Sequence, residues 1–217
     1  MAKRRKVGNL MALALLSVLA HEEPMHTYEM ARALRAFGKD EDMDIKWGSL
    51  YTVVQNLERH NFIEAVESSQ VGRRPERTVY TITEMGRREL IDWTRELVST
   101  PQRGANPFRA GLSVISVLSP REAEELLRRR LSAVEREAAA VRELMRSHSV
   151  TFPRLFMVED EYMLAVLEAE AAWVRGLVDE LASGSFPDLK MWQKGHETGQ
   201  IPEELAELAK KAIAEQK

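Results

Sequence analysis

Hydrophobic residues recur at helical spacing through most of the chain, and the clearest example begins near Gly48. The apolar positions there fall at i, i+3, i+4 and i+7, which places them on one helical face: Leu50, Val53, Val54 and Leu57. The opposite face carries amide, hydroxyl and guanidinium groups but no acid: Thr52, Gln55, Asn56 and Arg59, with Tyr51 on its flank. Such groups can hydrogen-bond base edges and phosphates. An ordinary amphipathic helix has the same pattern, so the neighbouring segments must distinguish the two interpretations.

Two helices are predicted before this stretch. Residues 9–20 are apolar nearly all round, which predicts the central core helix of a domain, and Pro24 prevents its continuation. Thr27 is a suitable N-cap for a second helix that runs to about residue 37. An acidic connector, residues 39–44, then leads into the third helix.

The period changes after Asn61, a candidate left-handed cap of the third helix. Residues 62–67 and 78–83 are short segments rich in β-branched and aromatic residues, and the Gly- and Pro-containing segment between them is typical of a loop. The pair predicts a β-hairpin with a basic tip, followed by a helix that Thr83 caps and that ends near residue 98. Three helices followed by a hairpin are the order of a winged helix-turn-helix, whose third helix enters the major groove.

A second, wholly helical region follows a linker at residues 99–107. We expect a helix over residues 108–117 and a longer helix that begins at Ser119-Pro120-Arg121-Glu122, which is a capping box with Pro at the first position. Heptad spacing marks a seam on that helix: Leu127, Leu131, Val134, Ala138, Val141 and Met145. A second seam marks the last long helix: Leu164, Leu167, Ala171, Val174, Val178 and Leu181.

Two seams on consecutive helices predict a helical hairpin, and each seam could cover the other within one chain. Further apolar residues would then still lack cover: Leu126, Leu144, Met163, Val166, Trp173 and Leu177. We therefore expect a homodimer. The residues that we assign to dimerisation are Leu127, Leu131, Val134, Ala138, Val141, Leu167, Val174, Val178 and Leu181.

The predicted fold class is mainly α, with an N-terminal winged helix-turn-helix that carries a β-hairpin wing and a C-terminal α-helical dimerisation domain. The expected domains are residues 1–100 for DNA binding, residues 101–184 for dimerisation, and residues 185–217 as a C-terminal tail. Loop residues punctuate the first part of this tail, and we expect a short helix after Pro202.

Several short motifs in this predicted fold together resemble the PadR family of transcriptional regulators. The motifs are His26-Thr27-Tyr28, Gly48-Ser49-Leu50-Tyr51, Leu57-Glu58, Arg73-Arg74-Pro75 and the run from Val79 to Gly86. The resemblance extends to about Gly184 and is to the longer subgroup with a C-terminal helical dimerisation domain. It implies a dimeric regulator, and we expect a repressor. It also implies effectors that are often aromatic or phenolic small molecules.

Site residues follow from the motifs and from local charge. The resemblance implies backbone or base contacts by Tyr28, Ser49 and Tyr51, and phosphate contacts by the arginines of the wing. The net charge of −3 makes basic edges, such as the N-terminal Lys3-Arg4-Arg5-Lys6, the places to look for DNA contacts. The full expected set is Lys3, Arg4, Arg5, Tyr28, Lys46, Ser49, Tyr51, Thr52, Gln55, Asn56, Arg73, Arg74 and Arg77. Trp93 and Trp173 are candidates for lining an effector pocket between the domains.

The sequence gives little sign of a metal site, a cofactor site or a catalytic site. The chain has no cysteine and five scattered histidines, of which His21 and His26 are the one pair near enough in sequence to share a metal. We expect no cofactor, no metal and no enzyme. The apolar run from Leu10 to Ala20 is too short to span a bilayer, so we expect a cytoplasmic protein with no membrane partner. The alternative function is a protein-interaction module whose winged helix does not bind DNA.

Overall fold

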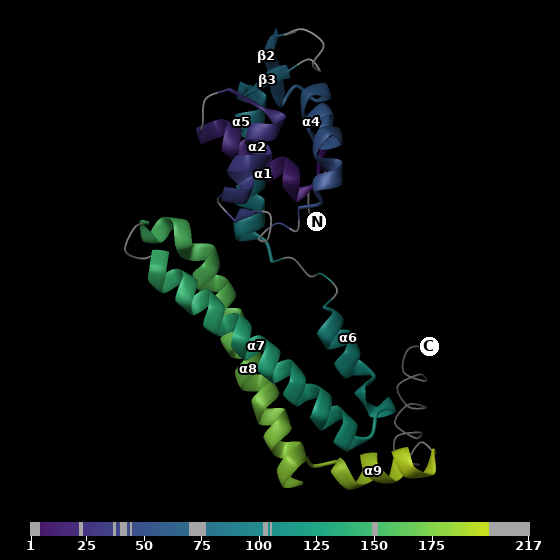
Figure 1. Ribbon diagram of the computed structural model, residues 1–217. Coiled ribbons are helices and arrows are strands. Elements are labelled where there is room, and N and C mark those ends of the chain that lie inside the picture. Colours follow the sequence, from purple (N-terminus) through teal and green to yellow (C-terminus); the bar gives the residue numbers. More distant parts are fainter. Residues whose placement is uncertain are drawn as a thin grey trace. The chain divides into compact units, whose positions relative to one another are not determined.

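A computed structural model describes residues 5–21, 24–36, 38–39, 43, 45–69, 77–101, 104, 106–148 and 152–199, apart from the side chains of 67–69 and 77. The chain divides between residues 104 and 105 into two compact units, called unit 1 and unit 2 below. In Figure 1 the labels α1 to α5 mark unit 1 and the labels α6 to α9 mark unit 2.

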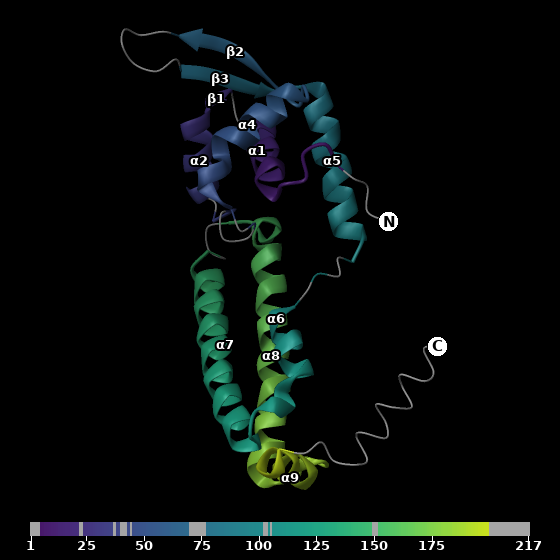
Figure 2. The same ribbon diagram turned by 90° about the vertical axis from the view of Figure 1, so that its right-hand side faces the viewer.

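Unit 1 is organised around its first helix. Its helices are α1 (Leu10–His21), α2 (Thr27–Ala36), the short 3-10 helix η1 (Trp47–Ser49), α4 (Leu50–Arg59) and α5 (Glu84–Ser99). α1 packs against α2, α4 and α5, and Figure 2 shows it between them. Met11, Leu15 and Leu16 of α1 have no exposed surface, which follows from a helix that is apolar all round.

A small antiparallel sheet completes unit 1. Its strands are β1 (Met25–His26), β2 (Ile63–Ser69) and β3 (Arg77–Ile82), in the order β1-β3-β2. The hairpin of β2 and β3 confirms the predicted wing, and a bulge between Ala65 and Glu67 shifts its register. β1 was not predicted, because two residues after Pro24 show no strand period and pair only through β3, with Met25 opposite Tyr80.

The wing joins α5 through a tightly packed corner. Asn61 has φ 58°, which confirms the left-handed cap. Thr83 caps α5 by accepting a hydrogen bond from the Gly86 amide at 3.0 Å, and its own hydroxyl donates to the Asn61 carbonyl at 2.6 Å. A Cβ on Gly86 would lie 2.0 Å from the Phe62 carbonyl oxygen, so no side chain fits here without a shift of the backbone.

Unit 2 is built on an antiparallel helical hairpin. Its helices are α6 (Pro107–Ser113), η2 (Ile115–Val117), α7 (Pro120–His148), η3 (Arg154–Met157), α8 (Val158–Ser183) and α9 (Leu189–Thr198). The Glu122 amide donates to the Ser119 hydroxyl at 3.1 Å, as the capping motif predicted. The single helix expected over residues 108–117 is wrong, because the chain leaves α-helical geometry at Val114 before the 3-10 turn η2.

The segment after Gly184 differs from the expected loop. Gly184 ends α8 in the left-handed conformation, with φ 75°, and α9 then forms across a region that Gly and Pro marked as irregular. Tertiary contact explains the helix, because the Trp192 indole donates to the Leu118 carbonyl at 2.9 Å and its ring packs edge-on against Phe186. The short helix expected after Pro202 lies outside the described residues.

Candidate nucleic-acid interface

Helix α4 has the two faces that its sequence predicts. Leu50, Val53, Val54 and Leu57 are each at most 8% exposed and pack into the core of unit 1. On the opposite side Tyr51 is 69% exposed, and Thr52, Gln55 and Arg59 are exposed as well. Asn56 is half-buried at the edge of that stripe. The exposed stripe therefore presents one phenol, one hydroxyl, one amide and one guanidinium along about two helical turns.

The start of α4 is held by a local hydrogen bond. The Ser49 hydroxyl donates to the Lys46 carbonyl at 2.8 Å, and Lys46 itself is exposed. Because the hydroxyl proton is used within the chain, Ser49 can accept a hydrogen bond from a ligand more readily than it can donate one to a phosphate. A base amino group or a water is therefore a better partner for the Ser49 hydroxyl oxygen than a phosphate is.

Helix α2 contributes a second exposed stripe that the motif analysis missed. Tyr28 is 71% exposed, and Arg32 and Arg35 follow at i+4 and i+7 on the same face. The Arg35 guanidinium lies over the Trp47 ring at 4.1 Å, so Trp47 joins the end of α2 to the turn before α4. The i, i+4, i+7 spacing of a tyrosine and two arginines could have revealed this stripe from the sequence.

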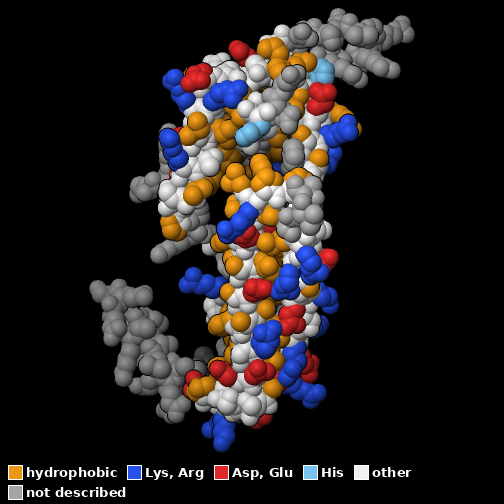
Figure 3. Space-filling view, turned by 90° about the vertical axis from the view of Figure 1, so that its left-hand side faces the viewer, with side chains coloured by type: hydrophobic (Ala, Val, Ile, Leu, Met, Phe, Trp, Pro, Cys, Tyr) orange, Lys and Arg blue, Asp and Glu red, His pale blue; other side chains and the backbone are white. Residues whose placement is uncertain are grey.

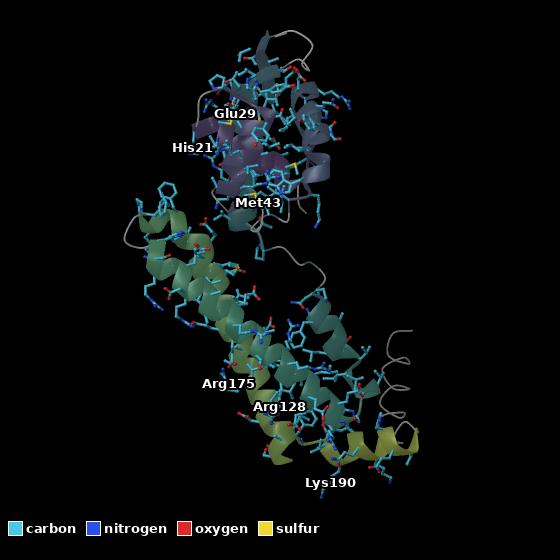
Figure 4. The ribbon with its side chains drawn as sticks, viewed as in Figure 1. His21, Glu29, Met43, Arg128, Arg175 and Lys190 are labelled. Carbon is cyan, nitrogen blue, oxygen red and sulfur yellow. The ribbon has the colours of Figure 1, made fainter. Side chains whose placement is uncertain are left out.

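Strand β1 ties the start of α2 to the wing. The His26 ring nitrogen Nδ1 lies 3.1 Å from the Thr78 carbonyl of β3, and the His26 amide donates to the Glu29 carboxylate at 2.8 Å. Glu29, visible on α2 in Figure 4, is thus used as a local cap. These bonds hold Tyr28 at the junction of α2 and the sheet.

Residues 15–92 match the model of the transcriptional regulator PadR-like family. Unit 1 belongs to the PadR-like family. The matched residues include α2, α4, the wing strands and the first half of α5, so they contain both exposed stripes.

Solved structures share the fold of about four fifths of this chain. Bacillus subtilis PadR in complex with operator DNA is similar at 18% identity and TM-score 0.65, over 79% of this chain and 99% of that one. The virulence activator AphA of Vibrio cholerae is similar at 19% identity and TM-score 0.58, over 80% and 98%. The PadR-like regulator BC1756 of Bacillus cereus is similar at 15% identity and TM-score 0.57, over 80% and 98%. No curated protein matches the sequence.

Arg5 is not available for DNA, which corrects its prediction as a DNA contact. Its side chain is only 5% exposed and is ion-paired with Glu89 at 2.6 Å and with Glu96, both on α5. Its guanidinium also lies 5.2 Å from the Trp93 ring centroid. Burial alone would lower the pKa of Arg5, but the hydrogen bonds with the two carboxylates outweigh it and raise the pKa. Arg5 thus fastens the start of the chain to α5.

The remaining predicted basic contacts lie mostly outside the described residues. These are Lys3, Arg4, Arg73 and Arg74. Arg77 begins β3, and its side chain is also outside the description. The wing and the N-terminal residues therefore stay predictions as DNA contacts.

The predicted dimerisation residues find partners within one chain. Seven of the nine are at most 7% exposed between α7 and α8: Leu127, Val134, Ala138, Val141, Val174, Val178 and Leu181. Leu131 and Leu167 are half-buried. Other large apolar side chains remain exposed on the hairpin, among them Tyr162 at 73% and Trp173 at 53%. A contact with a second chain must therefore use those other side chains.

The two tryptophans proposed for an effector pocket belong to different units. Trp93 is 5% exposed within the core of the PadR-like unit, beneath Arg5. Trp173 lies on α8 and contacts Phe108 of α6 edge-on, at 6.1 Å between ring centroids. The Trp93 ring is therefore buried in the core of unit 1, whereas part of the Trp173 ring is exposed and could contact a ligand.

Among the described residues, no group of three His, Asp or Glu side chains is placed to hold a metal ion. None of the helices that the structure describes is long and apolar enough to cross a membrane.

Proposed function

We propose that this protein is a sequence-specific DNA-binding regulator of transcription that acts as a dimer, and that it is a repressor. The observation that carries the proposal is the exposed polar stripe of α4, which stands opposite the buried stripe of the same helix in a PadR-like unit. The PadR structure from Bacillus subtilis with this fold was solved with operator DNA. Because the proposed partner is chromosomal DNA, we place the protein in the cytoplasm.

We assign base contacts to the exposed stripe of α4 and phosphate contacts to the exposed stripe of α2. Gln55 can bond an adenine edge with both its donor and its acceptor, and Thr52 can contact either a base or a thymine methyl group. Each good base contact contributes about 1–3 kcal/mol of discrimination. Arg32 and Arg35 lie on α2, which is not the helix that we place in the major groove, and we assign them to phosphates. Tyr28 and Tyr51 then brace the backbone on either side.

Helix α8 supplies the first argument for a dimer. Its buried seam faces α7, yet Tyr162, Val166 and Trp173 form a second apolar stripe that is 46–73% exposed. At about 100° per residue, this stripe lies roughly 120° round the helix from the seam. A helix with two apolar stripes belongs inside a larger bundle than one hairpin provides.

Helix α7 places its own second stripe on the same side. Leu126 and Leu144, 37% and 43% exposed, lie roughly 90° from the α7 seam in the same rotational sense. Because the two helices are antiparallel, equal senses of rotation point both stripes toward one broad side of the hairpin. Two cross-helix ion pairs bridge the other side, Arg142–Glu168 at 2.6 Å and Arg175–Glu135 at 2.5 Å, and a third, Arg130–Glu170 at 2.6 Å, crosses the apolar side. Figure 3 shows hydrophobic side chains along the hairpin among charged ones.

A dimer supplies two α4 helices, as DNA with two half-sites on neighbouring turns of the major groove, about 34 Å apart, requires. We further propose that a small hydrophobic or aromatic effector releases the DNA by favouring a dimer with a different separation of these helices. Bacillus subtilis PadR, which shares the fold, was also solved with p-coumaric acid.

A gel shift with the DNA upstream of the protein's own gene tests the proposal. Gln55→Ala should reduce the preference for that DNA over random duplex, because it removes a base-reading amide. Arg32→Gln should weaken binding to all duplexes and reduce the salt slope by about 1. Arg121→Gln, an 89% exposed arginine of unit 2, is the matched control and should change neither. If all three variants behave like the wild type on every duplex, the winged helix does not bind DNA through these stripes, and an interaction module becomes the better assignment.

A further inference from the structure

The end of the hairpin where α7 gives way to η3 and α8 contains a cavity of about 540 Å³. Its apolar lining comes from three elements: Met145 of α7, Met157 of η3, Leu164 of α8 and the adjoining Phe152. Met157 is buried, whereas Phe152 is 47% exposed at the rim. The volume is that of sites that bind small organic ligands. Thioether and aromatic groups adapt well to flat apolar rings.

The polar lining is dominated by cations. Arg142 and Arg146 project from successive turns of α7, Arg154 comes from η3, and Glu161 is the single acid among the lining residues. Each arginine already has a carboxylate partner: Glu168, Glu143 and Glu161 respectively. Glu168 and Glu143 lie outside the lining, so within the cavity three guanidinium groups face one carboxylate.

Those ion pairs are open to exchange. The side chains of Arg142 and Glu168 are 50% and 52% exposed, and that of Arg154 is 79% exposed. Ion pairs with this exposure are weak and are screened by salt. An incoming carboxylate or sulfonate can therefore share a guanidinium, which has more donors than one carboxylate occupies.

We propose that this cavity binds an amphipathic organic anion, with its apolar body against Met145 and Met157 and its acidic group on Arg142 and Arg154. The site deepens the proposed effector control, and only its effect on DNA rests on the proposed function. By helical geometry, Arg142, Arg146 and Glu161 lie on the side of the hairpin that the Arg142–Glu168 and Arg175–Glu135 pairs bridge, not on the apolar side assigned to the dimer. The cavity therefore stays accessible in the dimer.

The probe is 2-naphthoate, with the uncharged 2-naphthylmethanol as its matched analogue. Binding is followed on the full chain by NMR of methionines labelled with ¹³C at the methyl group, assigned by single Met→Leu variants. We expect saturable ring-current shifts of Met145 and Met157, with Met11 and Met30 of unit 1 unmoved. We also expect the acid to bind roughly tenfold more tightly than the alcohol, as a charge-assisted hydrogen bond provides.

Arg142→Gln and Arg154→Gln should each raise the Kd of the acid by roughly tenfold and leave that of the alcohol unchanged. The matched control is Arg175→Gln. Arg175 also forms a cross-helix pair and has a 49% exposed side chain, but it lies along the hairpin away from the cavity, as Figure 4 shows. Its replacement should leave both constants within twofold of the wild type.

Three results would overturn the site: no saturable shift at Met145 and Met157, equal binding of acid and alcohol, or unchanged binding in both arginine variants. DNA binding is measured separately, by fluorescence anisotropy with and without 2-naphthoate. Ligand binding without any DNA binding would refute the proposed regulator and leave the site standing. DNA binding without ligand binding would refute the site and leave the proposed regulator standing.

Discussion

Replacement of Gly86 by alanine tests the tightest contact of the fold. A methyl group there would lie 2.0 Å from the Phe62 carbonyl oxygen and 2.9 Å from the Ile82 Cγ1 atom. The Phe62 oxygen cannot move aside freely, because it accepts a hydrogen bond from the Thr83 amide at 3.1 Å. The wing and α5 must therefore separate, or this bond must break.

Two effects of opposite sign decide how far Gly86→Ala changes the free energy of unfolding. Alanine favours a helix over glycine by about 1 kcal/mol. Overpacking against backbone costs about 1–3 kcal/mol, and the loss of a carbonyl's hydrogen bond costs about 1 kcal/mol more. The clash wins, and we expect the free energy of unfolding of unit 1 to fall by about 2 kcal/mol. For a domain of this size, such a loss lowers Tm by roughly 10 °C.

The assay is urea unfolding followed by tryptophan fluorescence. A background with Trp173→Phe and Trp192→Phe leaves Trp47 and Trp93, both in unit 1, as the reporters. The control is Gly176→Ala on α8, where no atom lies within 4 Å of the added carbon. Because Gly176 belongs to unit 2, that variant should leave the unfolding of unit 1 that Trp47 and Trp93 report unchanged. A Gly86→Ala protein that is as stable as the background would refute the close approach of Phe62 to α5.

Three further predictions follow from the ion pairs and the exposed apolar side. Arg5→Gln should lower the free energy of unfolding of unit 1 by about 2 kcal/mol, because it removes a nearly buried cation that is ion-paired with Glu89 and Glu96, while DNA affinity stays within twofold. A large loss of affinity would return Arg5 to the DNA interface. Val166→Glu should give a monomer in sedimentation velocity with the helix content unchanged, and an intact dimer would move the interface away from this stripe. The Arg154 hydrogen bond lowers the pKa of Glu161, so this pair forms above the ordinary Glu range and is lost as the pH falls through the lowered value. NMR titration should show the pKa of Glu161 rising in Arg154→Gln, and no change would mean that the pair does not form in solution.

The sequence alone was sufficient where the controlling interactions are local. The two faces of α4, the caps at Thr83 and Ser119, the turn at Asn61 and both seams of the hairpin depend on residues within a few positions of one another. The helices and the β2–β3 wing of unit 1 could be predicted for the same reason, because each of them has its own period or boundary signal. The exposed stripe of α2 also follows from local spacing, because Tyr28, Arg32 and Arg35 stand at i, i+4 and i+7.

The tertiary structure decided whatever depends on residues that are distant in sequence. Strand β1 exists because β3 pairs with it, and α9 forms where Trp192 finds the Leu118 carbonyl. Arg5 looked like a DNA contact because it stands among basic residues, yet carboxylates more than eighty positions away bury it. The same applies to the two hairpin seams, which are alike in sequence whether they meet each other or a second chain. Periodicity states that a face will be covered, whereas only the folded chain shows what covers it.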